Sequence, residues 1–323
     1  MKMWVGVFLL ALRFGWAGDA WSDKLAEGQA LFNRGQYVAA STRFRAALAE
    51  AESAHVEVRQ LIVLHDALAG SSAEAGHFAE AESEYKLAMA VLAKTEGTDS
   101  LHYAVLLASR ATLPTQTNDR DNMIRVLRKA VARHAGDGSS VELAVVRGCL
   151  ASLLRGQGQD EEEEALLLQA LADFKKDKTA ARHQVAGFLN DLAVLRLDQR
   201  RYDESIELQL QSIGLLVKDL GNEHPSLVIP YNNLATTYAN VKRYDDAEAA
   251  YERAIAICKK TLGEDHLSYG VLLENYAVVL KKAGRKREAK EMETQGHQIE
   301  RAAERHNGVG ATISVTALLS KDE

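Results

Sequence analysis

The chain has 323 residues, a formal net charge of −6 and only three prolines. Proteins that bind nucleic acids usually carry a basic face, and neither the net charge nor any run of Lys and Arg supplies one here. Alanine and leucine are abundant, and long packed helices prefer these residues. The composition therefore favours an almost wholly helical chain and argues against a nucleic-acid partner.

At the N-terminus, Lys2 precedes the apolar run 3–12, and small residues follow it. This pattern predicts a secretory signal peptide over residues 1–20, cleaved after Ala20 or Ala17. The run is too short to span a bilayer, which takes about 20 residues. We therefore expect export to the periplasm or the exterior of a bacterial cell. If the segment is not cleaved, it is the part of the chain that would contact a membrane.

Residues 222–261 predict a hairpin of two amphipathic helices. Apolar and small side chains recur in each half at the spacings of one helix face. Ala235 and Ala247 are small where two helices about 8–10 Å apart would press together. A single hairpin cannot bury this face alone, so it needs neighbours of the same kind. The face consists of Tyr231, Leu234, Ala235 and Tyr238 in the first half and Ala247, Tyr251, Ala254 and Cys258 in the second.

The neighbours are present in the sequence, because the same pattern recurs along the chain. Taking the residue at the turn of each hairpin, the successive spacings are 41, 42, 40, 42, 42 and 42 residues. Self-similarity at a fixed period predicts a solenoid. The seven turn residues are Gly35, Gly76, Asn118, Gly158, Arg200, Lys242 and Gly284.

The pattern G-x-Y-x-x-A-x-x-x-F-x-x-A, seen from Gly35 to Ala47, resembles the tetratricopeptide repeat. That repeat has a period of about 34 residues, so each helix here is longer by about one turn. The linker Leu220-Gly221-x-x-His224-Pro225 and the helix Asn232-Asn233-Leu234-Ala235 make the chain similar to kinesin light chains and many bacterial relatives. The resemblance implies an all-α fold, a right-handed α-solenoid of about seven helix-turn-helix repeats over residues 21–303, which binds protein.

Three places depart from a regular array. The third repeat, about 98–135, is degenerate: Pro114 falls where its first helix should continue, so we expect a shortened or kinked helix at 114–121. In the sixth repeat, Pro225 suits a first helical position, whereas Pro230 should lie a turn further in and bend the helix. The second helix of the seventh repeat is polar, as a terminal cap should be, and residues 304–323 should form a flexible tail.

Motifs for catalysis or metal binding are absent from the sequence. The ten histidines lack metal-ligand spacing, and no metalloprotease, phosphate-loop or nucleophile-elbow motif occurs. His224 and His266 differ by one period, which indicates linker residues of the repeat. Cys149 and Cys258 lie two repeats apart, so we expect two buried thiols and no disulfide. We therefore expect no enzyme activity, cofactor, metal or small-molecule substrate.

The resemblance implies that the first helix of each repeat lines an inner groove. Asparagine carries both donors and acceptors, so a row of asparagines could pair with the backbone of an extended peptide. Alternatively, some of them bond neighbouring helices and set the superhelical pitch, which suits Asn233 and Asn275 best. The groove candidates are Arg155, Asn190, Val194, Asn232, Asn233, Thr236, Glu274, Asn275 and Lys281.

Some tetratricopeptide proteins grip a C-terminal carboxylate with Lys or Arg in the groove. Here one recurring position holds Asp66, Asn190, Asn232 and Glu274 instead, which argues against such a clamp. The leading hypothesis is a non-enzymatic scaffold or adaptor that binds a protein or peptide segment in the groove. The alternatives are a structural subunit of a bacterial envelope or secretion assembly, and an accessory module of a separate catalytic chain.

Overall fold

The computed structural model describes residues 19–114, 119–136, 141–176 and 182–307. These residues form fourteen α-helices and one 3₁₀ helix, and no strand occurs among them. The predicted all-α fold of seven successive hairpins is confirmed. The chain divides near residue 180 into two compact units, which we call the N-terminal and the C-terminal unit. Residues 1–18 of the predicted signal peptide lie outside the described part.

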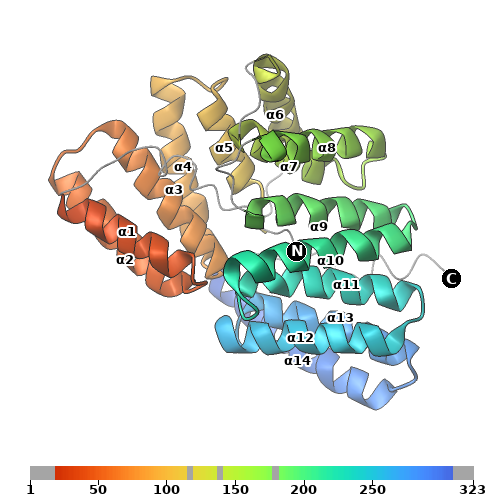
Figure 1. Ribbon diagram of the computed structural model, residues 1–323. Helices are drawn as coiled ribbons and strands as arrows, with labels where there is room; N and C mark the ends of the chain where they lie inside the picture. The colour runs from red at the N-terminus through yellow and green to blue at the C-terminus, as the bar shows by residue number, and fades with distance from the viewer. Residues whose placement is uncertain (1–18, 115–118, 137–140, 177–181, 308–323) are drawn as a thin grey trace. The chain divides into compact units, whose positions relative to one another are not determined.

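The N-terminal unit contains four hairpins (Figure 1). The two helices of each hairpin pack on each other, and helices of neighbouring hairpins pack in turn, as α2 does on α3 and α4 on α5. Phe44 and Leu64 are fully buried in the core of the first two hairpins. The helices are α1 (Ala20–Phe32), α2 (Tyr37–Ser53), α3 (Val58–Glu74), α4 (Phe78–Thr95), α5 (Leu101–Arg110), α6 (Arg120–His134), α7 (Val141–Leu154) and α8 (Asp160–Lys176).

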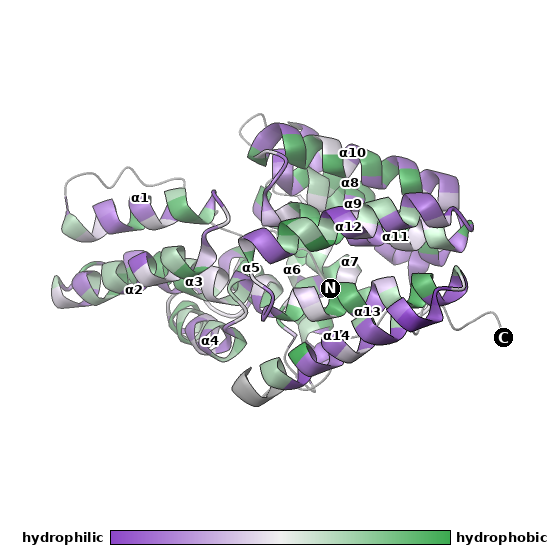
Figure 2. Cartoon of the chain, turned by 90° about the horizontal axis from the view of Figure 1, so that it is seen from below, coloured by the Kyte–Doolittle hydropathy of each residue, from purple (hydrophilic) through white to green (hydrophobic). Residues whose placement is uncertain are grey.

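The C-terminal unit contains three hairpins, and the first helix of the middle one, α11, also contacts the first helices of its neighbours, α9 and α13. Its core includes Tyr251, which stacks on Tyr276 with ring centroids 5.5 Å apart. The last helix is mostly hydrophilic (Figure 2). The helices are α9 (Arg182–Asp198), α10 (Tyr202–Leu220), the 3₁₀ helix η2 (Pro225–Leu227), α11 (Val228–Asn240), α12 (Tyr244–Thr261), α13 (Leu267–Lys282) and α14 (Lys286–Asn307). Residues 304–307 of the predicted tail are thus helical, and 308–323 lie outside the described part.

The turn residues confirm the predicted register of the repeats. Each one that the structure describes has a positive φ, the left-handed conformation that ends a helix and lets the chain reverse. The φ values are 73° for Gly35, 81° for Gly76, 72° for Gly158, 61° for Arg200 and Lys242, and 85° for Gly284. Asn118, the turn residue of the degenerate repeat, lies outside the described residues.

The prolines act as predicted in two places and not in a third. Helix α5 ends at Arg110 after ten residues, which confirms a shortened helix before Pro114. Pro225 opens η2 at its first position. The predicted position of Pro230, a turn inside a helix, is wrong: α11 begins at Val228, so Pro230 lies in its first turn, where a missing N–H costs no intrahelical bond.

His224 and His266 occupy equivalent positions before η2 and α13. The Nδ1 atom of each accepts a hydrogen bond of 3.2 Å from the backbone N–H two residues later, that of Ser226 or Ser268. The repeated histidine is therefore a helix cap. None of the described helices is both long and apolar enough to cross a bilayer. Both cysteines are buried and outside any disulfide, as expected.

Candidate functional site

Four of the candidate asparagines bond to one another across three helices of the C-terminal unit. The Nδ2 atom of Asn275 in α13 donates to Oδ1 of Asn232 in α11 at 2.9 Å. Asn232 donates to its neighbour Asn233 at 3.2 Å, and Asn233 donates to Asn190 in α9 at 3.0 Å. We call this chain the asparagine ladder. It joins the first helices of three successive hairpins.

Burial shows which amides remain near the surface. Asn190, Asn232 and Asn275 are 2%, 5% and 1% exposed, whereas Asn233 is half-buried. The asparagines of the ladder thus bond neighbouring helices, as the alternative interpretation of these residues states. Contact between the asparagines and a peptide stays a prediction, and Asn233 is the member of the ladder that is best placed for it.

A layer of buried polar side chains on α10 was not predicted. In α10, Ser205, Gln209 and Ser212 are fully buried at the positions that hold Ala247, Tyr251 and Ala254 one repeat later. Their side chains bond the helices around them. Ser205 and Ser212 donate to backbone carbonyls of α9, at 2.8 and 2.7 Å, and Gln209 donates to Thr237 of α11 at 3.2 Å. Polar residues at core positions of the repeat were the sequence signal for this layer.

Thr236, another candidate, also lies in the interior. Its hydroxyl donates to the Asn232 carbonyl at 3.0 Å and lies 2.9 Å from the Tyr251 hydroxyl. Burial raises the pKa of Tyr251, so this hydroxyl stays protonated. Val194 of α9 and Val278 of α13 are half-buried at the helical position equivalent to Thr236. Two valines therefore flank a buried threonine along this face.

Glu274 and Lys281 lie where α13 meets α14. Glu274 packs so closely on α14 that a Cβ on Gly296 would come within 2.6 Å of its Cγ. Burial, followed by the nearby Glu300 and Glu293, raises the pKa of Glu274 to about 7. The Lys281 ammonium donates to both oxygens of Glu293 at 2.8 Å. Both residues therefore contribute to the seam between these helices.

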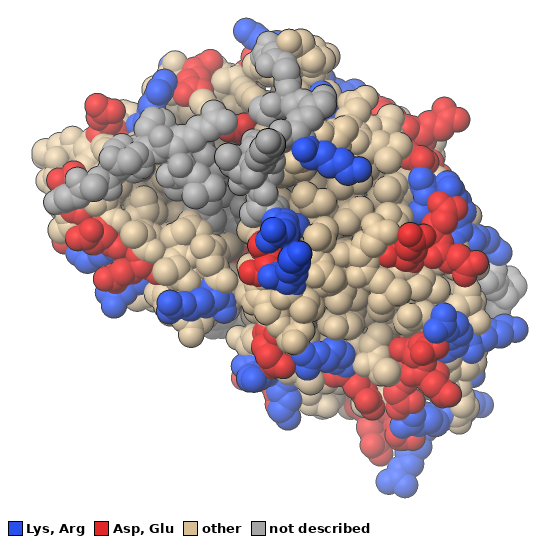
Figure 3. Space-filling model, viewed as in Figure 1, with Lys and Arg blue, Asp and Glu red and all other residues tan. Residues whose placement is uncertain are grey.

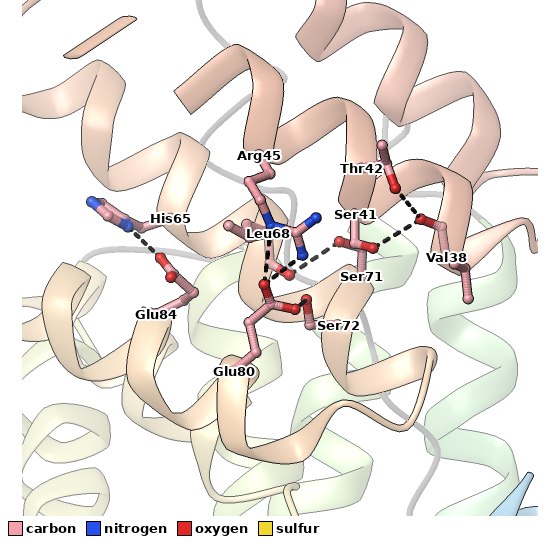
Figure 4. Close-up of polar contacts among 10 residues, drawn as sticks. All are labelled: Val38, Ser41, Thr42, Arg45, His65, Leu68, Ser71, Ser72, Glu80 and Glu84. Carbon is pink, nitrogen blue, oxygen red and sulfur yellow. Dashed lines mark hydrogen bonds and ion pairs between the residues drawn. The ribbon is translucent and has the colours of Figure 1, made fainter. Parts of the chain in front are cut away.

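Arg155 belongs to the N-terminal unit, where its Nε donates to the buried Glu163 at 3.0 Å. In the same unit, ion pairs link neighbouring helices (Figure 4). Arg45 of α2 donates through Nε to Glu80 of α4 at 3.2 Å, and Glu80 also accepts from Ser72 of α3 at 2.7 Å. The structure thus brings eight of the nine candidates into the C-terminal unit and leaves Arg155 in the other.

In comparisons with known proteins, residues 226–302 match the family model of the tetratricopeptide repeat. No curated protein matches the chain. Among solved structures, a putative kinesin light chain from Podosopora anserina with nearly identical TPR-like repeats is similar, with a TM-score of 0.51 and 25% sequence identity. The alignment covers 64% of this chain and 98% of that one.

Two further structures share the fold at low identity. Aspartyl phosphate phosphatase F from Bacillus subtilis aligns with a TM-score of 0.52 and 14% identity, over 90% of this chain and 77% of that one. A Rap protein complexed with Competence and Sporulation Factor aligns with a TM-score of 0.51 and 13% identity, over 88% and 98%. Residues 226–302 are thus tetratricopeptide repeats, and the chain shares the fold of kinesin-light-chain-like repeats over 64% of its length.

Proposed function

We propose that the protein is a non-enzymatic scaffold that binds an extended protein segment on the first-helix face, by which we mean α9, α11 and α13 of the C-terminal unit. The observation that carries this proposal is the asparagine ladder, in which Asn233 is half-buried, together with half-buried Val194 and Val278 on the same helices. The ladder fixes the spacing of the three helices before any ligand arrives. A preorganised surface loses less entropy when it binds.

The chemistry of this face suits an extended segment. An amide carries two N–H donors and two acceptor lone pairs, and the ladder uses one of each from Asn233. The remaining donor and lone pair can serve the backbone of a bound segment. Val194 and Val278 can contact apolar side chains of the segment. Both valines are half-buried and uncharged, so binding does not require a charge to be desolvated.

The charge distribution supports a protein partner. On the face drawn in Figure 3, Lys and Arg lie intermixed with Asp and Glu, so no broad field of one sign is present there. Many charged side chains of the described residues are paired. Arg253 and Lys260, for example, both contact Glu223. Nucleic-acid binding relies on an excess of cations at the contact surface, and protein interaction is the general role of this repeat family.

Export belongs to the proposal as well. It is supported by Lys2 and the apolar run 3–12, which resemble a cleaved signal. N-terminal sequencing of the protein from its native host tests this point directly. A mature chain that begins at Gly18 or Trp21 agrees with export, and one that begins at residue 1 or 2 in the cytosol contradicts it.

The binding proposal can be tested by selecting a random peptide library, displayed on phage, against the full-length protein. Val194→Arg and Val278→Arg each place a long cation on the first-helix face and should weaken the selected peptides at least tenfold. Leu210→Arg is the matched control, because Leu210 is 49% exposed on the second helix α10. If Leu210→Arg abolishes binding and the valine variants do not, the outer face binds, as expected of an assembly subunit.

A further inference from the structure

Helix α14 is held in the C-terminal unit chiefly by its contact with α13, beside which it lies (Figure 2). Each of α10 to α13 packs on at least two other helices. The apolar contacts of α14 are few: Ala289 is fully buried, and Met292 and Ile299 are partly buried against the core of the unit. Elements with few apolar contacts open more readily than the rest of a structure. The position of α14 therefore depends strongly on the groups between it and α13.

The two helices cross closely at a pair of glycines. A Cβ on Gly296 of α14 would lie 2.8 Å from the backbone oxygen of Gly270 in α13, and 2.6 Å from Cγ of Glu274. Glu274 thus lies in the crossing itself, one turn after Gly270. Its side chain is 12% exposed, so water has little access to the carboxyl group while α14 is in place.

Two carboxyl groups of α14 face Glu274 at this crossing. Glu300 shares a side-chain hydrogen bond with Glu274, and Glu293 lies near enough for its charge to act on it. A hydrogen bond between two carboxyl groups requires that one of them carries a proton. Two carboxylates that share a site repel each other when both are ionised. Ionisation of Glu274 therefore removes a bond between the helices and replaces it with repulsion.

The cations near Glu274 do not neutralise this cluster at every pH. The Lys281 ammonium is bound to both oxygens of Glu293. Nε2 of His297 lies 3.3 Å from Oε1 of Glu274, on a side chain that is 52% exposed. Histidine side chains carry a positive charge at acidic pH and change charge between about pH 5 and 8, so His297 can pair with Glu274 only in its protonated form.

The other helices that pack on α13 leave the cluster unchanged. Helix α11, from Val228 to Asn240, contains no charged residue. Helix α12 contributes Glu248, which accepts a hydrogen bond of 2.6 Å from the Tyr276 hydroxyl. Tyr276 and Glu274 are two residues apart on α13, so they point to different sides of that helix.

We propose that the seam between α13 and α14 is a pH-dependent switch, in which a proton shared by Glu274 and Glu300 holds α14 in place and its loss lets α14 open. The switch goes beyond the proposed function, because it concerns the terminal hairpin alone and does not require a bound segment.

The direction of the switch follows from the two states of Glu274. With α14 open, Glu274 is in water and has the ordinary carboxyl pKa of 4.5, whereas burial, followed by Glu300 and Glu293, raises the pKa to about 7 in the closed state. The proton therefore stabilises the closed state fully below pH 4.5, and this stabilisation is lost as pH rises through about 7. Pairing with a protonated His297 would act in the same direction.

Hydrogen exchange of the full-length protein, followed by mass spectrometry at pH 5.5 and pH 8, tests the proposal. Rates are corrected for the intrinsic exchange rate at each pH. We expect the opening constant of α14 to be about fivefold larger at pH 8, after allowance for solvent screening. Helix α12 should stay protected when α14 opens.

Glu274→Gln should remove this pH dependence, because the amide donates to Glu300 at every pH as the protonated carboxyl does. At pH 8, α14 should be better protected in this variant than in the wild type, a result that a damaged fold does not give. Glu252→Gln is the matched control, at an exposed glutamate of α12, and should behave as the wild type. His297→Gln should keep the increase at pH 8.

Four results would overturn the proposal. They are an opening constant of α14 that does not rise in the wild type, a rise that persists in Glu274→Gln, a rise that only His297→Gln removes, and joint opening of α12 with α14.

Discussion

Single residues at the turns carry a conformational cost that varies between repeats. Gly35, Gly76 and Gly284 adopt positive φ freely, whereas Arg200 and Lys242 adopt it at 61° with a side chain. For a residue with a Cβ, this conformation costs about 1–2 kcal/mol. The fifth and sixth repeats therefore hold strain at a position where the first, second, fourth and seventh repeats have glycine.

Lys242→Gly should stabilise the protein by about 0.5–1 kcal/mol, because relief of the strain exceeds the extra entropy that glycine gains on unfolding. Urea denaturation measures the change. The reciprocal variant is Gly284→Lys, where an added Cβ meets no atom within 4 Å and only the backbone conformation is tested. It should destabilise by a similar amount, and a stabilising effect there would contradict the account.

Glu274→Gln should change how stability depends on pH. In the folded protein, burial, followed by Glu300 and Glu293, raises the pKa of Glu274 from 4.5 to about 7. Between these values the unfolded chain loses its proton while the folded chain keeps it, so wild-type stability falls as pH rises from 4.5 to 7.

The stability of the Glu274→Gln variant should not fall in this pH range, because a glutamine side chain does not titrate. Its free energy of unfolding should exceed that of the wild type by about 1 kcal/mol at pH 8, after allowance for solvent screening. At pH 4.5 the two proteins should differ little. Thermal unfolding of both proteins across this range measures the difference. A constant difference at all pH values would show that Glu274 does not titrate as described.

For single residues, the sequence predicts the helix position that a residue occupies better than it predicts the hydrogen bonds of its side chain. The 42-residue period places Asn190 and Asn232 at one helix position, and Asn233 and Asn275 at the next. Whether each amide meets a ligand or its neighbour depends on how closely successive first helices approach, which the period does not specify.

At the scale of helices, the two helices of a hairpin can approach closely where a small residue lies at their crossing. A Cβ on Gly28 of α1 would lie 2.5 Å from Cε1 of Phe44 in α2, and Phe44 is fully buried. The close crossing of α1 and α2 thus requires a glycine at this position.

Gly28→Ala should destabilise the protein by about 1–3 kcal/mol, because an overpacked core must shift. Gly214→Ala is the matched control, since Gly214 also lies inside a helix but its added Cβ meets no atom within 4 Å. That variant should be neutral or stabilising by up to about 1 kcal/mol. Equal destabilisation of both in urea would argue that helix propensity, and not packing, governs Gly28.

Helix boundaries show where sequence reasoning succeeds and where it stops. The turn residues and the shortened α5 could be predicted, because glycine and proline act on the local backbone. The 3₁₀ turn before α11 was missed. Pro230 lacks an N–H for the carbonyl of Ser226, which shifts the α-helical start to Val228, and a pattern of apolar positions does not reveal this change in hydrogen bonding.

At the scale of the molecule, each hairpin is stabilised by its neighbours, as in other repeat proteins. In the C-terminal unit, the apolar core and the asparagine ladder both cross from one hairpin to the next. Loss of a ladder residue should therefore weaken the whole unit and not a single helix.

Asn232→Ala should lower the free energy of unfolding by about 1–3 kcal/mol, because it leaves a donor of Asn275 and an acceptor of Asn233 without their partner. Asn240→Ala is the control, since the Asn240 side chain bonds only the Thr236 carbonyl of its own helix among the contacts described. It should cost less than half as much. Equal losses would mean that the ladder does not couple the hairpins.

The central claim, that the first helices of the C-terminal unit bind an extended segment, is tested most directly by hydrogen exchange of the full-length protein with and without a selected peptide. We expect the peptide to slow amide exchange in α9, α11 and α13, and to leave the outer turns of α10 and α12 unchanged. Slower exchange confined to α10, α12 or α14 would contradict the claim and place the binding surface on the second helices.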